Sequence, residues 1–241
     1  MEGKKAQLSL IIPVYNEEHE LEKKLKTIHN YLKKVGILKD FEIVVVNNGS
    51  TDDTQNLLNE LSKQFSNIVS VNLKQRGLGL ALNKGLSVSK YDAMMFVSID
   101  LGFGAKFIKT SLDNYLKGYD LVLGSKGHKN SIYEAPFQRK IFSLALNKIS
   151  RLLFKIKCSD TQGTFLITKA CYNKIKPNLK SPSPFYQAQV VIYATNSNAR
   201  IVELPVIYRA GNRMSKIKLS DALTITLELV EEYKIILVQK V

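Results

Sequence analysis

The sequence has few cysteines, few histidines and no long hydrophobic run. Its 241 residues include two cysteines, Cys158 and Cys171, and three histidines. These small numbers exclude a disulfide framework and a structural zinc site, and they make a reducing, cytosolic setting the expectation. No stretch approaches the roughly 18 consecutive apolar residues of a membrane-spanning helix. The first residues also lack the apolar segment and cleavage site of a secretory signal.

Internal repeats and low-complexity segments are missing too. The proportions of 45% hydrophobic and 23% charged residues are those of a globular protein. The unusual property is an excess of positive charge, with a net charge of +14. Such a charge indicates an acidic partner. Composition leaves three classes open: nucleic acid, an anionic membrane surface and a phosphorylated substrate.

Short apolar segments alternate with helical patterns in the first half of the chain. Strands are expected at 8–15, 41–47, 67–73, 93–99 and 119–125, and helices at 17–35, 52–65, 78–89 and 104–117. Several of the strands are apolar throughout, as strands buried on both faces are. The alternation therefore predicts an α/β fold with an open, mostly parallel, twisted sheet flanked by helices.

The second half is less regular. Residues 134–157 have the pattern of a basic amphipathic helix, and 158–169 that of a loop entering a strand. A further strand is expected at 199–209, where Pro205 indicates an edge or a break. A last helix is expected from Ser220, with one side formed by Leu223, Leu227, Val230 and Lys234.

Polar or glycine-rich loops follow all five strands of the first half. They are PVYNEE (13–18), NNGSTDDT (47–54), KQRGLGLALNKG (74–85), SIDLGFG (98–104) and GSKGH (124–128). Ligands of open α/β sheets bind at the carboxyl ends of the strands. Five such loops at one edge therefore predict a binding site there.

Several of these residues also have a purely local explanation. Asn16 could cap a helix, Ser50 with Asp53 fits a capping box, and Asp100 could be another cap. The functional alternative gives Tyr15 a base to stack on and Glu17 a ribose or base edge. In that alternative Asp100 binds a divalent ion or a ribose.

The segment 76–85 is similar to a glycine-rich phosphate cradle at a helix start. It lacks the G-x-G-x-x-G spacing, and it follows the third strand, not the first. A dinucleotide-dependent dehydrogenase is therefore not expected.

Taken in order, the loops resemble a known family. PVYNE, N-x-G-S-x-D, G-L-G-x-A-x-x-x-G and the apolar strand ending in Asp100 resemble inverting glycosyltransferases of the GT-A fold, family 2. The later segments GSK (124–126), QRKIFSLALNKISR (138–151), DTQGTF (160–165) and ELPVIYRAGNRMSKI (203–217) are similar to polyprenyl-phosphate hexose synthases, the dolichyl-phosphate mannose and glucose group. The resemblance implies a GT-A domain over 1–218. An amphipathic helix over 219–241 would belong to that domain or pack on it.

The resemblance implies a site for a nucleotide-diphosphate sugar. The donor residues that it implies are Pro13, Tyr15, Glu17, Asn48, Ser98 and Asp100. Two positions depart from the family, because Asn48 replaces an aspartate and Ser98 replaces the first carboxylate of Asp-x-Asp. Asp100 is thus the implied ligand of a Mg²⁺ or Mn²⁺ ion. Alternatively, a lysine such as Lys106 or Lys216 neutralises the diphosphate without metal.

The implied acceptor is a polyprenyl monophosphate. Its phosphate and the donor diphosphate would be contacted by Lys126, Arg139, Asp160, Gln162, Arg213 and Lys216. Among all these residues Asp100, Lys126 and Arg139 would be catalytic. A phosphate is already largely ionised near pH 7, since its second pKa is about 6. The reaction would therefore need positioning and charge stabilisation but no general base.

The acceptor also implies a membrane. The basic helix at 137–157 is expected to lie in the membrane interface, which makes the protein peripheral on the cytoplasmic membrane face. A membrane-anchoring subunit is a further implied partner. Three alternatives remain: a catalytically impaired protein of this fold, a transferase acting on a growing glycan, and a nucleic-acid binder. The last is disfavoured, because the lysines are spread along the chain and no nucleic-acid recognition motif is present.

Overall fold

The computed structural model of the chain describes residues 4–209 and 219–238. Arg213 and Lys216, two of the predicted site residues, lie outside the described residues. The backbone of Arg139 is described, but its side chain is not.

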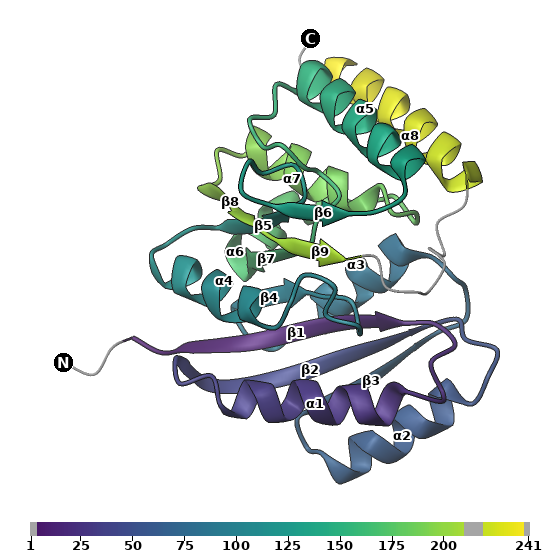
Figure 1. Cartoon of the computed structure of the whole chain (residues 1–241), viewed down its shortest axis with the longest axis vertical. Coiled ribbons are helices and arrows are strands. Elements are labelled where there is room, and N and C mark those ends of the chain that lie inside the picture. The colour runs from purple at the N-terminus through teal and green to yellow at the C-terminus, as the bar shows by residue number, and fades with distance from the viewer. Residues whose placement is uncertain (1–3, 210–218, 239–241) are drawn as a thin grey trace.

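A seven-stranded sheet forms the centre of the molecule (Figure 1). Its strands are β1 (Ala6–Val14), β2 (Leu38–Asn48), β3 (Ile68–Leu73), β4 (Ala93–Phe96), β5 (Leu121–Ser125), β7 (Phe165–Thr168) and β8 (Ile201–Pro205). Their order is β3-β2-β1-β4-β7-β5-β8, and only β7 runs antiparallel to its neighbours. The predicted open, mostly parallel sheet is confirmed.

The sheet is buried on both faces. Successive residues of β1 alternate between two cores, with Leu10 and Ile12 in one and Ile11 in the other. This explains why the strand is apolar without alternation. One face is covered by α1 (Leu21–Lys33), α2 (Thr54–Gln64) and α4 (Lys106–Leu116). The other is covered by α3 (Leu78–Val88), α6 (Lys169–Ile175) and α7 (Tyr186–Asn196), with a 3₁₀ turn at Lys176–Asn178.

The direction of β7 decides which loop reaches the predicted site. β4 and β5 both pair antiparallel with β7, so they run in the same direction as each other. The amino end of β7 therefore lies at the edge where β4 and β5 have their carboxyl ends. As a result the loop 158–164, which precedes β7, meets the segments that follow β4 and β5.

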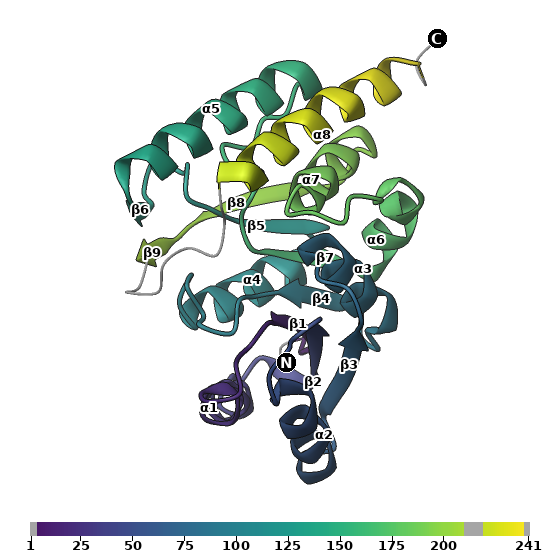
Figure 2. The ribbon, with the colours of Figure 1, turned by 90° about the vertical axis from the view of Figure 1, so that its right-hand side faces the viewer.

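Two long helices, α5 (Phe137–Phe154) and α8 (Leu219–Val238), pack side by side outside α7 (Figures 1 and 2). The rings of Phe154 and Tyr233 meet edge to face, with their centroids 5.9 Å apart. Ile225 and Leu229 of α8 belong to the same core as Leu146 of α5. The C-terminal helix is thus joined to this part of the molecule by buried apolar contacts.

The side of α8 that the sequence singled out is not the side that packs against the protein. Leu227 is 66% exposed and Val230 43% exposed, and Lys234 is exposed as well. The side chain of Leu223 lies outside the described part of the chain. The buried side consists of Ile225, Leu229, Glu232 and Ile236. A glutamate interrupts this apolar stripe, so the pattern of apolar residues alone pointed to another side.

A small second sheet completes the fold. It consists of β6 (Ile132–Glu134) and β9 (Ile207–Arg209), which pair in parallel. Pro205 is the last residue of β8, which confirms the predicted break between β8 and β9. The rings of Tyr133 and Tyr208 lie 5.6 Å apart, and Tyr208 also contacts Phe103 at 5.4 Å. The small sheet is thereby joined to the loop that follows β4.

Candidate active site

The loops after β1 and β2 are held together by side chains that were expected to cap helices. The N–H of Asn16 donates to Ser50 Oγ at 3.0 Å, and the N–H of Thr51 donates to Asn16 Oδ1 at 2.9 Å. At the start of α2, Asp53 makes no side-chain capping hydrogen bond. Both capping predictions are therefore wrong, because Asn16 and Ser50 join the two loops, and Asp53 Oδ1 accepts from the side chain of Asn56 and not from a backbone N–H of its helix.

The glycine-rich loop after β3 is filled by protein. The N–H of Gly77 donates to Asn48 Oδ1 at 2.8 Å, which gives this predicted donor residue a structural partner. The N–H of Gly79 donates to the Pro182 carbonyl at 3.0 Å, and a Cβ on Gly79 would lie 2.0 Å from the Ser181 carbonyl oxygen. The interpretation as an open phosphate cradle is wrong, since these glycines make room for the segment 181–183.

Tyr15 is covered on one face by a residue that the sequence did not single out. The guanidinium carbon of Arg76 lies 4.2 Å from the centre of the Tyr15 ring. Arg76 is itself an exposed residue, and a guanidinium can also stack on an aromatic ligand. Pro13 lies near the carboxyl end of β1. It follows Ile11, which is the last residue of β1 that pairs with β4. Both predicted residues are thus at the carboxyl edge of the sheet.

Asp100 is bound by a lysine from α1. The Nζ of Lys24 lies 2.5 Å from Asp100 Oδ1, 2.8 Å from Glu20 Oε2 and 3.4 Å from Glu17 Oε2. Burial lowers the pKa of Lys24, but the hydrogen bonds to Asp100 and Glu20 outweigh burial and leave that pKa above its usual value. Lys24 therefore stays charged and joins the predicted residues Glu17 and Asp100.

Asp100 is not a helix cap. The helix that follows, α4, has Ala105 at its N-cap position, without a side-chain capping bond. Leu101, directly after Asp100, has a positive φ of 46°, a conformation that a leucine seldom adopts. The loop is closed by hydrogen bonds from the Leu101 N–H to the Ser98 carbonyl, at 2.9 Å, and from the Gly102 N–H to Ser98 Oγ, at 3.3 Å. These contacts restrain the backbone of the loop that carries Asp100.

The residues around Asp100 do not fit a divalent metal ion. Mg²⁺ and Mn²⁺ are bound through oxygen ligands, usually from more than one acidic side chain or phosphate. Of the two Asp-x-Asp positions, Asp100 alone carries a carboxylate, and that carboxylate is paired with Lys24. The structure also shows no group of three or more His, Cys, Asp or Glu residues suited to a metal, as far as it describes the chain. In this structure the carboxylate that was predicted to bind a metal ion is paired with the ammonium group of Lys24.

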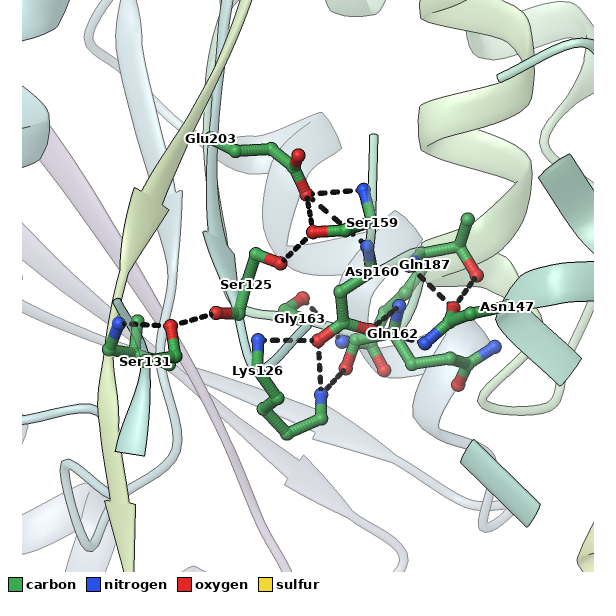
Figure 3. A network of polar contacts seen from close by, with 12 residues as sticks. Ser125, Lys126, Ser131, Asn147, Ser159, Asp160, Gln162, Gly163, Gln187 and Glu203 are labelled. Carbon is green, nitrogen blue, oxygen red and sulfur yellow. Dashed lines mark hydrogen bonds and ion pairs between the residues drawn. The ribbon is translucent and has the colours of Figure 1, made fainter. Parts of the chain in front are cut away.

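The predicted acceptor residues form a second cluster (Figure 3). Lys126 Nζ lies 2.8 Å from Asp160 Oδ2 and donates to the Gln162 carbonyl at 3.1 Å. Burial alone would raise the pKa of Asp160. The charge of Lys126 and the N–H groups of Lys126 and Gln162 outweigh burial and hold that pKa below its usual value. Lys126 and Asp160 are thus a charged pair in a mostly buried position.

The loop that carries Asp160 is held by residues that the sequence did not indicate. Asn147 of α5 accepts the Thr161 N–H at 2.9 Å. Glu203 of β8 accepts the Ser159 N–H at 2.7 Å (Figure 3). Both residues lie in segments that the family resemblance covers, 138–151 and 203–217, but only the tertiary structure shows their contacts with this loop.

Gly163 and Gln162 set the shape of this cluster. A Cβ on Gly163 would lie 2.0 Å from the Gly124 carbonyl oxygen, so this close approach requires glycine. Nε2 of Gln162 is buried and has no hydrogen-bond partner among the described residues. A buried donor without a partner is unfavourable. It is therefore a group that a bound ligand or water would satisfy.

The two clusters are neighbours. Phe103 belongs to the loop that begins after β4 and carries Asp100. Lys126 Nζ lies 5.7 Å from the centre of the Phe103 ring. The structure thus brings Glu17 and Asp100 together in one cluster and Lys126, Asp160 and Gln162 in the other, at one edge of the sheet.

Comparison with known proteins decides the family. Residues 9–175 match the family described as Glycosyl transferase family 2. The chain belongs to this family. The expected family and its GT-A fold are confirmed.

Relatives of this glycosyltransferase chain include larger proteins. It is 28% identical to "Dolichol-phosphate mannosyltransferase" of Pyrococcus furiosus over 84% of the chain and 56% of the relative. It is 22% identical to "Glycosyltransferase AglD" of Haloferax volcanii over 83% of the chain and 32% of the relative. The chain therefore spans about one third to just over half the length of these relatives.

Solved structures of the same fold include glucosyl-3-phosphoglycerate synthase from Mycobacterium tuberculosis. Its complex with UDP has a TM-score of 0.69 at 16% identity, and covers 95% of this glycosyltransferase chain and 80% of the synthase. The complex with Mn²⁺ and UDP-glucose has a TM-score of 0.66 at 16% identity, with 95% and 79% covered. At this identity the likeness shows the fold alone.

Proposed function

We propose that the chain transfers a hexose, mannose or glucose, from a nucleotide-diphosphate sugar to a polyprenyl or dolichyl monophosphate at the cytoplasmic face of a membrane. One observation carries the acceptor class: an apolar surface borders the charged cluster of Lys126 and Asp160. Such a neighbourhood fits a molecule with a phosphate head and a hydrocarbon tail. The similarity to a protein named dolichol-phosphate mannosyltransferase supports the same acceptor.

The apolar surface is formed by α5, α8 and the small sheet. The described residues include 14 exposed large hydrophobic side chains, and 12 of them lie on these elements. They are Ile132, Phe137, Ile141, Leu144, Ile149, Leu152, Ile207, Leu227, Val230, Ile235, Leu237 and Val238. Exposed apolar residues concentrated in this way indicate an interaction surface and not chance exposure.

The cluster and this surface are joined by the segment between β5 and α5, and Asn147 of α5 contacts the Asp160 loop directly. Ser131, just before β6, donates its hydroxyl to the Ser125 carbonyl at 2.6 Å, next to Lys126 (Figure 3). From there the chain passes through β6 to Phe137, the first residue of α5, whose side chain is 75% exposed. A lipid phosphate at Lys126 would thus have an apolar path toward α5.

Basic residues on α5 favour an anionic lipid surface. Lys148 and Arg151 lie on the exposed part of this helix, between Leu144 and Leu152. Basic residues near an anionic membrane each contribute about 1 kcal/mol of attraction. Within the described residues, none of the helices is both apolar enough and long enough to cross a bilayer. Attachment through this surface, with or without an anchoring subunit, is therefore part of the proposal.

The reaction needs little chemistry from the protein. A phosphate oxygen of the acceptor attacks the anomeric carbon as the bond to the nucleoside diphosphate breaks, and inversion follows from attack on the opposite face. Lys126 and Arg139 would bind the acceptor phosphate. Tyr15, Arg76 and Asn48 would bind the nucleoside. Positive charge around the diphosphate stabilises the leaving group. The proposal assigns no step to Mg²⁺ or Mn²⁺, because the groups around Asp100 do not fit one.

The test is a transfer assay with the purified chain. Labelled UDP-glucose or GDP-mannose is incubated with polyprenyl monophosphate in anionic vesicles, and label is counted in the lipid fraction. We expect transfer to the phosphate and none to polyprenol without phosphate. Lys126→Met should lower the rate about a hundredfold. Lys109→Met should not, since Lys109 forms an exposed pair with Asp113.

The other outcomes identify the alternatives. Donor binding without transfer to any acceptor would indicate a catalytically impaired protein and contradict the proposal. Transfer to an oligosaccharide, with none to the lipid phosphate, would replace the lipid acceptor with a growing glycan. Equal rates for Lys126→Met and Lys109→Met would contradict the proposed role of Lys126.

A further inference from the structure

Lys24 lies where local forces do not favour a lysine. It is the fourth residue of α1, and a cation in the first turn of a helix opposes the helix dipole. The side chain is also mostly buried, with 18% of its surface exposed. Both effects disfavour the ammonium group at this position. Its contacts with Glu17, Glu20 and Asp100 must therefore offset them.

The contacts of Lys24 differ in a way that matters for a ligand. Glu17 is nearly buried, with 6% of its side chain exposed. Asp100 and Glu20 are 51% and 50% exposed, so their bonds to Lys24 lie at the open edge of the sheet. An ammonium has three N–H donors. Lys24 could exchange its bond to Glu20 for one to a phosphate oxygen of a ligand. The Glu20 carboxylate would then be hydrated by water, so the exchange would cost little free energy.

We propose that Lys24 is the resident cation of the donor site. Bound to Asp100, it occupies the position that a divalent ion would need, and its charge makes binding of the donor diphosphate independent of a divalent metal. The inference rests on the proposed function, since it assumes a nucleotide diphosphate at this edge. It follows from the pairing of Lys24 with Asp100 and from the missing second carboxylate at Ser98.

The test measures the binding of UDP and of GDP by calorimetry, in EDTA and in Mn²⁺. UDP and GDP are compared first, and the one that binds more tightly is used for the test. For the wild-type chain we expect its dissociation constant in EDTA to equal that in Mn²⁺ within about twofold. Lys24→Met should weaken binding in EDTA by about tenfold or more, because a hydrogen bond between charged groups is lost. Lys24→Arg, which keeps the charge, should restore most of the affinity.

The matched control is Lys26→Met on the same helix. Lys26 is exposed and pairs with Glu22 at 2.6 Å, so its loss should leave nucleotide binding unchanged. Thermal unfolding of each variant without nucleotide shows whether it is folded before binding is compared.

Several outcomes would overturn the inference. The first is that the wild-type chain binds nucleotide at least tenfold more weakly in EDTA than in Mn²⁺. That result would overturn the inference but would leave the proposed function standing. A second is Lys24→Met binding as tightly as wild type in EDTA. If neither nucleotide binds with or without Mn²⁺, the proposed function itself fails, and the inference fails with it.

Discussion

At the scale of single residues, the site depends on charges that are paired inside the protein. Lys126 and Asp160 are the clearest case, since 11% of the lysine side chain and none of the aspartate side chain is exposed. Removing one partner of such a pair leaves the other as an uncompensated charge, which is strongly unfavourable. The same contact serves the fold and the proposed acceptor site, so its two effects must be measured separately.

Asp160→Asn should therefore destabilise the chain. We expect a loss of about 3–5 kcal/mol in the free energy of unfolding near neutral pH. Asp113→Asn is the matched control, because Asp113 forms an exposed pair with Lys109 and its loss should change stability by less than about 1 kcal/mol. Urea denaturation of both variants measures the difference. Equal effects would contradict the buried pair.

The pH dependence has a defined sign. The pKa of Asp160 is lower in the folded chain than its ordinary value of 3.8. Such a group stabilises the folded state above its unfolded pKa, and this contribution is lost as the pH falls from that pKa through the folded one. Wild type should thus lose more stability than Asp160→Asn when urea denaturation is repeated from neutral pH down to about 3. Parallel curves would show that Asp160 is not the group responsible.

At the scale of the elements, α8 shows how a buried polar residue can mislead a reading of apolar periodicity. Its contact face contains Glu232, which accepts a hydrogen bond from Gln189 Nε2 at 2.7 Å and another from the Tyr193 hydroxyl. Both partners belong to α7, so the carboxylate is satisfied inside the contact. The exposed side of α8 carries Leu227, Val230 and Ile235 beside the charged residues Glu231 and Lys234. So many exposed apolar residues are unusual for a helix facing water and agree with the proposed lipid surface.

Two leucines on this helix provide a direct test of its orientation. Leu229 is fully buried, whereas Leu227 is 66% exposed. Leu229→Ala should lower the free energy of unfolding by about 2–5 kcal/mol, and Leu227→Ala by less than about 0.5 kcal/mol. Thermal or urea unfolding measures both. The reverse order would mean that α8 packs through its other side.

At the scale of the whole molecule, charge and exposed apolar surface act together. The chain has a net charge of +14, and most of the exposed large apolar side chains in its described part lie on α5, α8 and the small sheet. Long-range attraction to an anionic bilayer would bring the molecule to the surface, and burial of the apolar side chains would retain it.

Binding to vesicles should reflect both contributions. Sedimentation with anionic vesicles should decrease as salt rises from about 0.1 to 1 M, since the Debye length falls from about 10 to 3 Å. Leu152→Ser should weaken binding at every salt concentration, because this side chain is 79% exposed on α5. Leu80→Ser, a change on α3, is the control and should bind as wild type does. If vesicle binding changes neither with salt nor with Leu152→Ser, the proposed surface is contradicted.

The sequence by itself determined the sheet, the edge with the site and the family. Each strand is a local apolar run followed by a polar loop, and parallel strands bring such loops to one edge whatever their order. Glu17, Asp100 and Lys126 could therefore be selected before any contact was known, and the family resemblance added Asp160.

Only the tertiary structure decided what these residues touch. Lys24 and Asp100 are 76 residues apart, and they meet because β4 lies beside β1 and α1 follows β1. The antiparallel β7 places Asp160 against Lys126, and α7 supplies the partners of Glu232. The periodicity of apolar residues shows which side of a helix or strand is apolar. Which charged residues pair depends on which elements become neighbours in space, and no local sequence pattern gives that information.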